Sequence, residues 1–272
     1  MVVAGMKDAL VQTDPEGSIM TGYYETNLQH IQDALKRIDL LIQLRILEIR
    51  AEHADVNEFS GLYISEEEID ALLSTTYPAR NDDPRTQAIR RRIAELETEI
   101  KEKREESVRR GTSLKIPRLA MIFGLTPFEE DVLVVGMAPE LDTKYERLYA
   151  YLHNDATRKR PTVDLVLQVL CSSDEEKLHA RQYFNPAAPL LKHHLIQLRE
   201  EPEAAQKTLV SKFIEVDDRI INYLLDVNHL DPTIAPFTEL ILPQTGLGEI
   251  LLPEAVKKRI QKLSSWYPER RV

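Results

Sequence analysis

Three consecutive cations stand in a polar segment between two apolar, helix-like runs and could bind an anion: Arg158, Lys159 and Arg160. Clusters of arginine and lysine contact the phosphates of nucleotides and nucleic acids. A phosphate-binding turn also needs glycine where the backbone approaches the anion, and this segment has none. The preceding predicted helix ends at Asp155, and Pro161 with Thr162 begins the next. Because cations are stabilised near a helix C-terminus, the pattern predicts a solvated corner between two helices, with phosphate contact as the alternative.

A second group of polar side chains, Lys192, His193 and His194, lies in the short predicted helix Pro189–Leu195. Adjacent histidines on a helix point about 100° apart, so this pair makes a poor joint metal site. No cysteine or carboxylate stands at zinc-like spacing from it, and we expect one imidazole to pack while the other is solvated. Lys192 and His193 join the three cations of the corner as candidate contacts for a protein partner or a nucleic acid.

The rest of the chain shows no constellation of catalytic residues. Glu129, Glu130 and Asp131 follow a predicted helix start, where carboxylates offset the helix dipole. Cys171 ends an apolar run without a neighbouring histidine, which is typical of a small buried residue. Neither GxxxxGK[ST] nor GxGxxG occurs, and the nearest sequence, GLG at 246–248, lacks the lysine and the third glycine. We therefore expect no catalytic, cofactor-binding or metal-binding residues in this chain.

The composition is that of a soluble globular protein with an acidic balance. The 272 residues are 43% hydrophobic and 29% charged, and the formal net charge is −10. A protein that coats nucleic acid is usually basic, so this balance disfavours that class. The single cysteine excludes an intrachain disulfide and fits a reducing, cytoplasmic compartment. No apolar run reaches the ~18 residues that a membrane-spanning helix needs, so no contact with a membrane is expected.

The elements that must position these residues begin with two long helices. Apolar residues recur every three or four positions over 27–54, and a narrower stripe with coiled-coil spacing runs over 84–110. We expect the two helices to pair antiparallel as a helical hairpin over residues 23–111, after a flexible tail over 1–22. A short helix capped by Ser65 is expected between them. The mixed charges near the end of the second helix predict a solvated face, with a partner-binding surface as the alternative.

Short helices and then a change of pattern follow. Closely spaced helices over 112–161 predict a helical subdomain, in which Tyr149 and Tyr151 face different sides and Tyr151 is the expected core residue. The order helix, helix, helix, strand, loop, strand then indicates a winged-helix domain over 162–230. A linker and an amphipathic helix fill residues 231–272. The predicted fold class is therefore mainly α, with a small β component in the winged helix.

In a winged helix, the segment Pro189–Leu195 is the expected recognition helix. Base readout usually uses arginine, asparagine or glutamine, which this segment lacks. The wing that follows carries Glu200, Glu201 and Glu203, which would repel phosphates. Charge and side chains together favour a winged helix that contacts protein, and disfavour one that contacts nucleic acid.

Four short motifs lie within residues 119–170: FGLTPFE at Phe123–Glu129, APELD at Ala138–Asp142, LYAYL at Leu148–Leu152 and RKRPTV at Arg158–Val163. This pattern resembles the region that precedes the ATPase core in a group of prokaryotic AAA-type ATPases, where it carries a variant winged-helix domain. A looser likeness continues through residues 188–198 and 216–225, so that about half of the chain is covered.

The resemblance implies that this chain is the N-terminal portion of an AAA-type ATPase whose nucleotide-binding core follows the C-terminal helix. ATP and Mg²⁺ would bind to that downstream core, and the parent would assemble as a hexamer. The present residues would form a non-catalytic recognition and regulatory region that contacts a protein partner or substrate and its own ATPase core. A winged-helix nucleic-acid-binding module, which would use the same cations, is the alternative.

Overall fold

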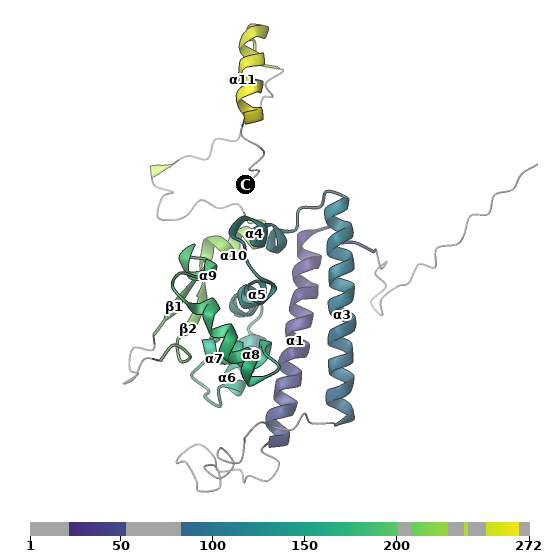
Figure 1. Cartoon of the computed structure of the whole chain (residues 1–272), viewed down its shortest axis with the longest axis vertical. Helices are drawn as coiled ribbons and strands as arrows, with labels where there is room; N and C mark the ends of the chain where they lie inside the picture. The colour runs from purple at the N-terminus through teal and green to yellow at the C-terminus, as the bar shows by residue number, and fades with distance from the viewer. Residues whose placement is uncertain (1–21, 53–82, 201–207, 228–236, 239–248, 267–272) are drawn as a thin grey trace, which may run out of the picture. The chain divides into compact units, whose positions relative to one another are not determined.

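A computed structural model describes residues 22–52, 83–200, 208–227, 237–238 and 249–266, and the fold is given for these (Figure 1). The chain divides into two compact units, residues 1–228 and 229–272. The first is mainly helical with one two-stranded sheet, as the sequence predicted. Nearly all of the predicted tail, the helix at Ser65 and most of the wing lie outside the described residues.

The long helices α1 (Asn27–Glu52) and α3 (Pro84–Arg109) lie side by side (Figure 1). Three ion pairs join the two helices: Asp33 with Lys103 at 3.1 Å, Arg37 with Glu97 at 2.7 Å, and Glu48 with Arg90. Later residues of α1 pair with earlier residues of α3, so the helices are antiparallel. Ile31, Ile38 and Ile42 of the apolar stripe of α1 are buried in the core. The hairpin as a continuous unit stays a prediction, because the residues that join the helices are not described.

Helix α5 (Pro127–Leu141) is the central element of the first unit and packs against α1, α7 and the sheet. It begins at a capping box in which Thr126 and Glu129 exchange side-chain-to-backbone hydrogen bonds, as its TPFE start favours. Most of its residues from Val132 onward are buried, so this helix is covered on nearly all sides. Gly136 permits the close approach to the sheet, since a Cβ there would lie 2.6 Å from Cγ2 of Val216.

Helices α4 (Lys115–Phe123) and α6 (Lys144–Leu152) flank α5 in sequence. The prediction that Tyr151 is the core residue of α6 was wrong. Tyr149 is fully buried and its hydroxyl donates a 2.8 Å hydrogen bond to the carbonyl oxygen of Val135, whereas Tyr151 is 46% exposed. The two tyrosines do face different sides, and the side that α5 covers carries Tyr149.

The winged-helix segment follows the predicted order of elements. Helices α7 (Val163–Leu170) and α8 (Asp174–Ala180), the 3-10 helix η1 (Arg181–Phe184) and the short α9 (Pro189–Lys192) precede the strands β1 (Ile196–Arg199) and β2 (Phe213–Val216), and α10 (Asp218–Leu224) closes the segment. The strands are antiparallel, with Ile196 opposite Val216 and Arg199 opposite Phe213. Ile196, Ile214 and Val216 are buried against the helices.

Helix α9 is shorter than the predicted Pro189–Leu195 recognition helix. It ends at Lys192 because His194 adopts a left-handed backbone conformation with φ of 55°. The amide of Leu195 then donates to the carbonyl oxygen of Leu190 at 2.9 Å, which closes the turn. This segment therefore presents one helical turn.

The second unit contains the amphipathic helix α11 (Glu254–Trp266), close to where the sequence placed it. Val256 and Ile260 lie one turn apart on this helix and are partly exposed. Within the described ranges, no helix combines the length and the apolarity that crossing a membrane requires.

Candidate functional site

The polar corner between α6 and α7 is built into the edge of the sheet. The imidazole Nε2 of His153 hydrogen-bonds the carbonyl oxygen of Arg160 at 3.1 Å, and the carbonyl oxygen of Pro161 accepts from the amide of Ile214 at 2.8 Å. Thr162 forms a bridge to β2 and also caps α7 with its side chain. The backbone of this solvated corner is therefore joined to β2, and of its three cations Arg160 reaches a side chain of that strand, Glu215.

Each of the three cations of this corner faces a carboxylate of the same unit. The pairs are Arg158 with Asp155 at 3.5 Å, Lys159 with Glu146 at 3.4 Å, and Arg160 with Glu215 at 3.0 Å and Glu140 at 3.9 Å. Arg199 also reaches Glu215, at 2.7 Å. Hydrogen bonds from Arg199 and then Arg160 hold the pKa of the Glu215 carboxyl below its usual value. The carboxylates reduce the positive potential that a phosphate would meet here.

The other two candidate contacts, Lys192 and His193, lie at α9 and not beside the corner. Helix α9 leads into the end of the sheet where Ile196 pairs with Val216, whereas the corner joins β2 at Phe213, the opposite end. Lys192 is exposed and forms no ion pair with another described residue, and the ring of His193 contacts Phe123 of α4 with centroids 5.0 Å apart. The structure thus separates the five predicted contact residues into two groups.

Helix α4 carries exposed apolar side chains. Met121 is 79% exposed and Ile122 is 55% exposed on α4, immediately before the Phe123 that contacts His193. The buried face of α4 is formed instead by Ile116, Leu119 and Ala120. We call Met121 and Ile122 the α4 patch. No sequence pattern distinguishes this patch, because its residues look like any other apolar part of a short helix.

The structure adds two observations on reactive groups. Cys171 is buried, and burial raises the pKa of its thiol to about 11, as expected for a packed residue and not for a nucleophile. Among the described residues, no three histidine, cysteine, aspartate or glutamate side chains are grouped as metal ligands would be.

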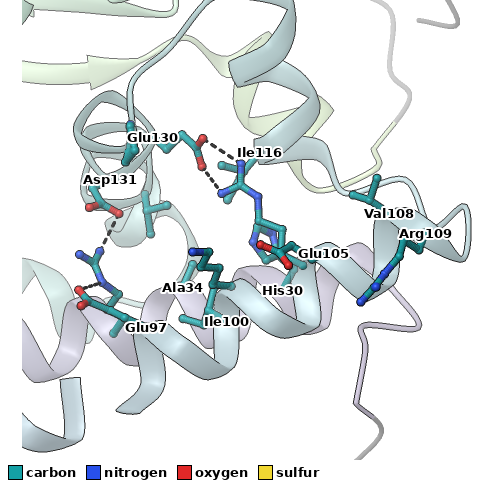
Figure 2. A pocket seen from close by; sticks show the side chains of 15 residues that line it. His30, Ala34, Glu97, Ile100, Glu105, Val108, Arg109, Ile116, Glu130 and Asp131 are labelled. Atoms are coloured by element: carbon teal, nitrogen blue, oxygen red, sulfur yellow. Dashed lines mark hydrogen bonds and ion pairs between the residues drawn. The ribbon is translucent and has the colours of Figure 1, made fainter. Parts of the chain in front are cut away.

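A cavity of about 750 Å³ lies between α1, α3, α4 and the N-terminal half of α5 (Figure 2). Helix α1 contributes His30, Ala34 and Arg37, and α3 contributes a stripe that runs from Glu97 to Arg109. From the sequence, we predict that the charges of that stripe form a solvated face. Spacing alone places them on one side of α3, but only the position of α5 shows that they enclose a space.

One family model matches this chain: a variant winged helix domain, over residues 12–238. No curated protein and no solved structure matches. The matched range starts well before the predicted winged-helix segment and includes both long helices. The match covers far more than half of the sequence, and the described elements from α7 to β2 have the winged-helix order. The chain belongs to the variant winged helix domain family.

Proposed function

We propose that this chain is the non-catalytic, N-terminal recognition and regulatory region of an AAA-type ATPase and that its winged helix contacts protein. ATP and Mg²⁺ would bind to a downstream core, and the present residues would select a partner or substrate in the cytoplasm. Winged-helix domains bind either nucleic acids or proteins, so the choice between the two depends on the surface that this chain presents.

A protein partner is favoured over a nucleic acid because the charges of the basic corner are neutralised. Arg158, Lys159 and Arg160 all face carboxylates. Nucleic-acid affinity comes largely from cations that neutralise phosphates and release counterions. A cation that already has an acidic neighbour gains less from a phosphate, and the net charge of −10 adds a general repulsion.

The α4 patch supports the same choice and offers a surface for the contact. Exposed apolar side chains beside a polar rim are typical of protein–protein interfaces, and methionine is enriched in them. His193 contacts Phe123, the residue that follows Met121 and Ile122 on α4. A protein partner could cover these side chains and remove apolar area from water, which a nucleic-acid backbone would not do to the same extent.

The link to an AAA-type ATPase rests on the four motifs between Phe123 and Val163. It is tested by the coding sequence that follows Val272 in the same reading frame. We expect a GxxxxGK[ST] motif between a strand and a helix, followed by an acidic strand end for Mg²⁺. A reading frame without these motifs contradicts the ATPase part of the proposal and leaves protein recognition untouched.

Protein recognition is tested by affinity capture with the full chain and two matched double variants. Met121→Asp with Ile122→Asp changes the α4 patch, and Arg158→Glu with Arg160→Glu changes the corner. We expect the first variant to lose partners that the wild type retains after nuclease treatment, and the second to keep them. Leu178→Asp, at another exposed apolar position on α8, is the control. Equal loss in all variants, or release by nuclease, contradicts the proposal.

A further inference from the structure

Two stretches of this acidic chain contain no acidic residue, and they lie against each other. Residues 107–128 and residues 177–199 have neither aspartate nor glutamate, although the whole chain has 45. Phe123 of the first stretch contacts His193 of the second with ring centroids 5.0 Å apart, and Phe128 stacks on Tyr183 at the same distance. The two stretches, which include α4, η1 and α9, therefore form one region without carboxylates of its own, which we call the acid-free region.

The solvent-facing side of α4 belongs to this region and carries a cation beside the α4 patch. Arg118 stands three positions before Met121 and four before Ile122, and the latter two are exposed. Residues with that spacing are neighbours on a helix surface, so the guanidinium group lies next to both apolar side chains. The buried residues of α4 are on the opposite side of the helix.

Three cations of the acid-free region are not neutralised within the described part of the chain. Arg118, Arg181 and Lys192 form no ion pair with another described residue. Lys115 differs from them, because it pairs with Asp226 at 2.8 Å. The region also differs from the corner between α6 and α7, where every cation faces a carboxylate. The positive charge of these three side chains is therefore available to an anionic partner.

An acidic amphipathic helix matches both the apolar pair and the charge. Such helices contact a partner through apolar anchors at i, i+3 and i+4, which would cover Met121 and Ile122. A carboxylate at the border of that stripe would form a charge-assisted hydrogen bond with Arg118. Complementary charge also speeds association and excludes basic competitors. The phosphates of a nucleic acid would satisfy the cations but would leave the apolar side chains in water.

We propose that the solvent-facing side of α4 binds an acidic amphipathic helix of a protein partner. The apolar stripe of that helix lies on the α4 patch, one of its carboxylates pairs with Arg118, and the cations of η1 and α9 attract the rest of the acidic segment. This inference rests on the proposed function, because it names the chemistry of the partner that the α4 patch contacts.

The test uses three labelled peptides of about 14 residues, the length of an ordinary helix. The acidic peptide has a leucine stripe with helical spacing and glutamate or glutamine elsewhere. The basic peptide replaces its glutamates with lysine, and the serine peptide replaces its leucines with serine. Each peptide is titrated with the full chain at ~50 mM salt, where charges are weakly screened, and fluorescence anisotropy reports binding.

We expect the acidic peptide to bind at least ~10-fold more tightly than either control peptide. The basic peptide places like charges beside Arg118, and the serine peptide buries little apolar area. We also expect the affinity for the acidic peptide to fall as salt is added, because part of the attraction is between exposed charges.

Variants locate the contact. Arg118→Glu should weaken the acidic peptide at least ~10-fold and strengthen the basic peptide, because it reverses the charge beside the patch. Lys192→Glu, at an exposed position, should change both affinities in the same directions. Met121→Ser with Ile122→Ser should lower the affinity for the acidic peptide to that for the serine peptide. Arg91→Glu, at an exposed position of α3, changes the net charge equally and should bind as the wild type does. Circular dichroism establishes that each variant is folded.

Several outcomes overturn this inference. Equal affinities for the acidic and basic peptides would refute the charge selection. Absence of acidic-peptide binding up to ~1 mM would remove the site. Unchanged binding in Arg118→Glu and in the serine double variant would place the peptide elsewhere. Phosphatidylserine vesicles that bind the chain, lose it in Arg118→Glu and outcompete the acidic peptide would assign the surface to a membrane.

The affinity capture described above separates failure of this inference from failure of the proposed function. Partners that are lost in the Met121→Asp, Ile122→Asp variant, together with no preference for the acidic peptide, would refute the acidic chemistry and leave protein recognition standing. Equal capture by all variants would contradict the proposed function, even if the acidic peptide binds to α4 as expected.

Discussion

The buried imidazole of His30 should make the stability of this protein fall in mild acid. Its pKa is lowered from 6.5 to about 4, chiefly by burial and further by Arg104, against an opposing contribution from Asp33. The unfolded chain, where His30 titrates normally, then binds a proton more readily than the native state does. Stability from this residue is complete above pH 6.5 and is lost as the pH falls towards 4.

The size of the effect follows from the two pKa values. Linkage of one site with pKa 6.5 unfolded and about 4 folded gives a loss of about 2 kcal/mol between pH 7 and pH 4.5. No large reduction for solvent screening is needed, because His30 is only 2% exposed and its ring packs against that of Tyr24. A loss of this size is a substantial part of the free energy that stabilises a typical domain.

The assay is urea unfolding of the wild type and of His30→Phe at both pH values. Carboxylates also titrate in this range, so the informative quantity is the difference between the two proteins in their change with pH. We expect the variant to lose about 2 kcal/mol less than the wild type. Met137→Leu, a volume-conserving change of a buried side chain without a titrating group, should match the wild type. If His30→Phe matches it as well, the imidazole is not buried as described.

Three further predictions concern packing, the thiol and the corner. Gly136→Ala should destabilise the protein by about 1–3 kcal/mol despite the better helix propensity of alanine, because the new methyl group meets Val216. Adding Val216→Ala should recover part of this loss, as measured by urea unfolding. Strictly additive losses in the double variant would contradict the contact. Iodoacetamide at pH 8 should alkylate Cys171 about 100-fold more slowly in the native protein than in the urea-unfolded chain, since folding raises the pKa of this thiol from 9.0 to about 11. Comparable alkylation rates by mass spectrometry would mean that the thiol is accessible. Arg160→Glu should change the free energy of unfolding by less than about 1 kcal/mol, because the ion pair of Arg160 with Glu215 is half-exposed. A much larger loss of unfolding free energy, measured in urea, would show that the corner holds the sheet together.

Local patterns predicted the helices well because helix periodicity and caps are properties of neighbouring residues. The predicted ranges 27–54 and 84–110 correspond to α1 and α3, and α5 begins just before Glu129, where a helix start was predicted. The left-handed His194 was not predictable in the same way. Glycine and asparagine are the usual residues at such a position, so no sequence feature indicates that α9 ends at Lys192.

The surroundings of the candidate residues depend on contacts that are distant in sequence. Arg160 meets Glu215, 55 positions later, and no spacing rule connects the two. Tyr149 and Tyr151 could not be ranked without knowing which side of α6 faces α5. The cavity combines residues of α1, α3, α4 and α5, and the charges along α3 match a solvated face equally well until α5 is in place. That the five contact residues bind a partner stays a prediction.

The central claim, that this winged helix contacts protein and not nucleic acid, is tested most directly by fluorescence anisotropy of a labelled duplex DNA titrated with the full chain at low salt. Because low salt strengthens any binding to phosphates, we expect no saturation at protein concentrations up to ~100 µM, the weak end of ordinary non-specific affinities. Micromolar binding that weakens as salt is added, and that is lost in the Arg158→Glu, Arg160→Glu double variant, would contradict the account.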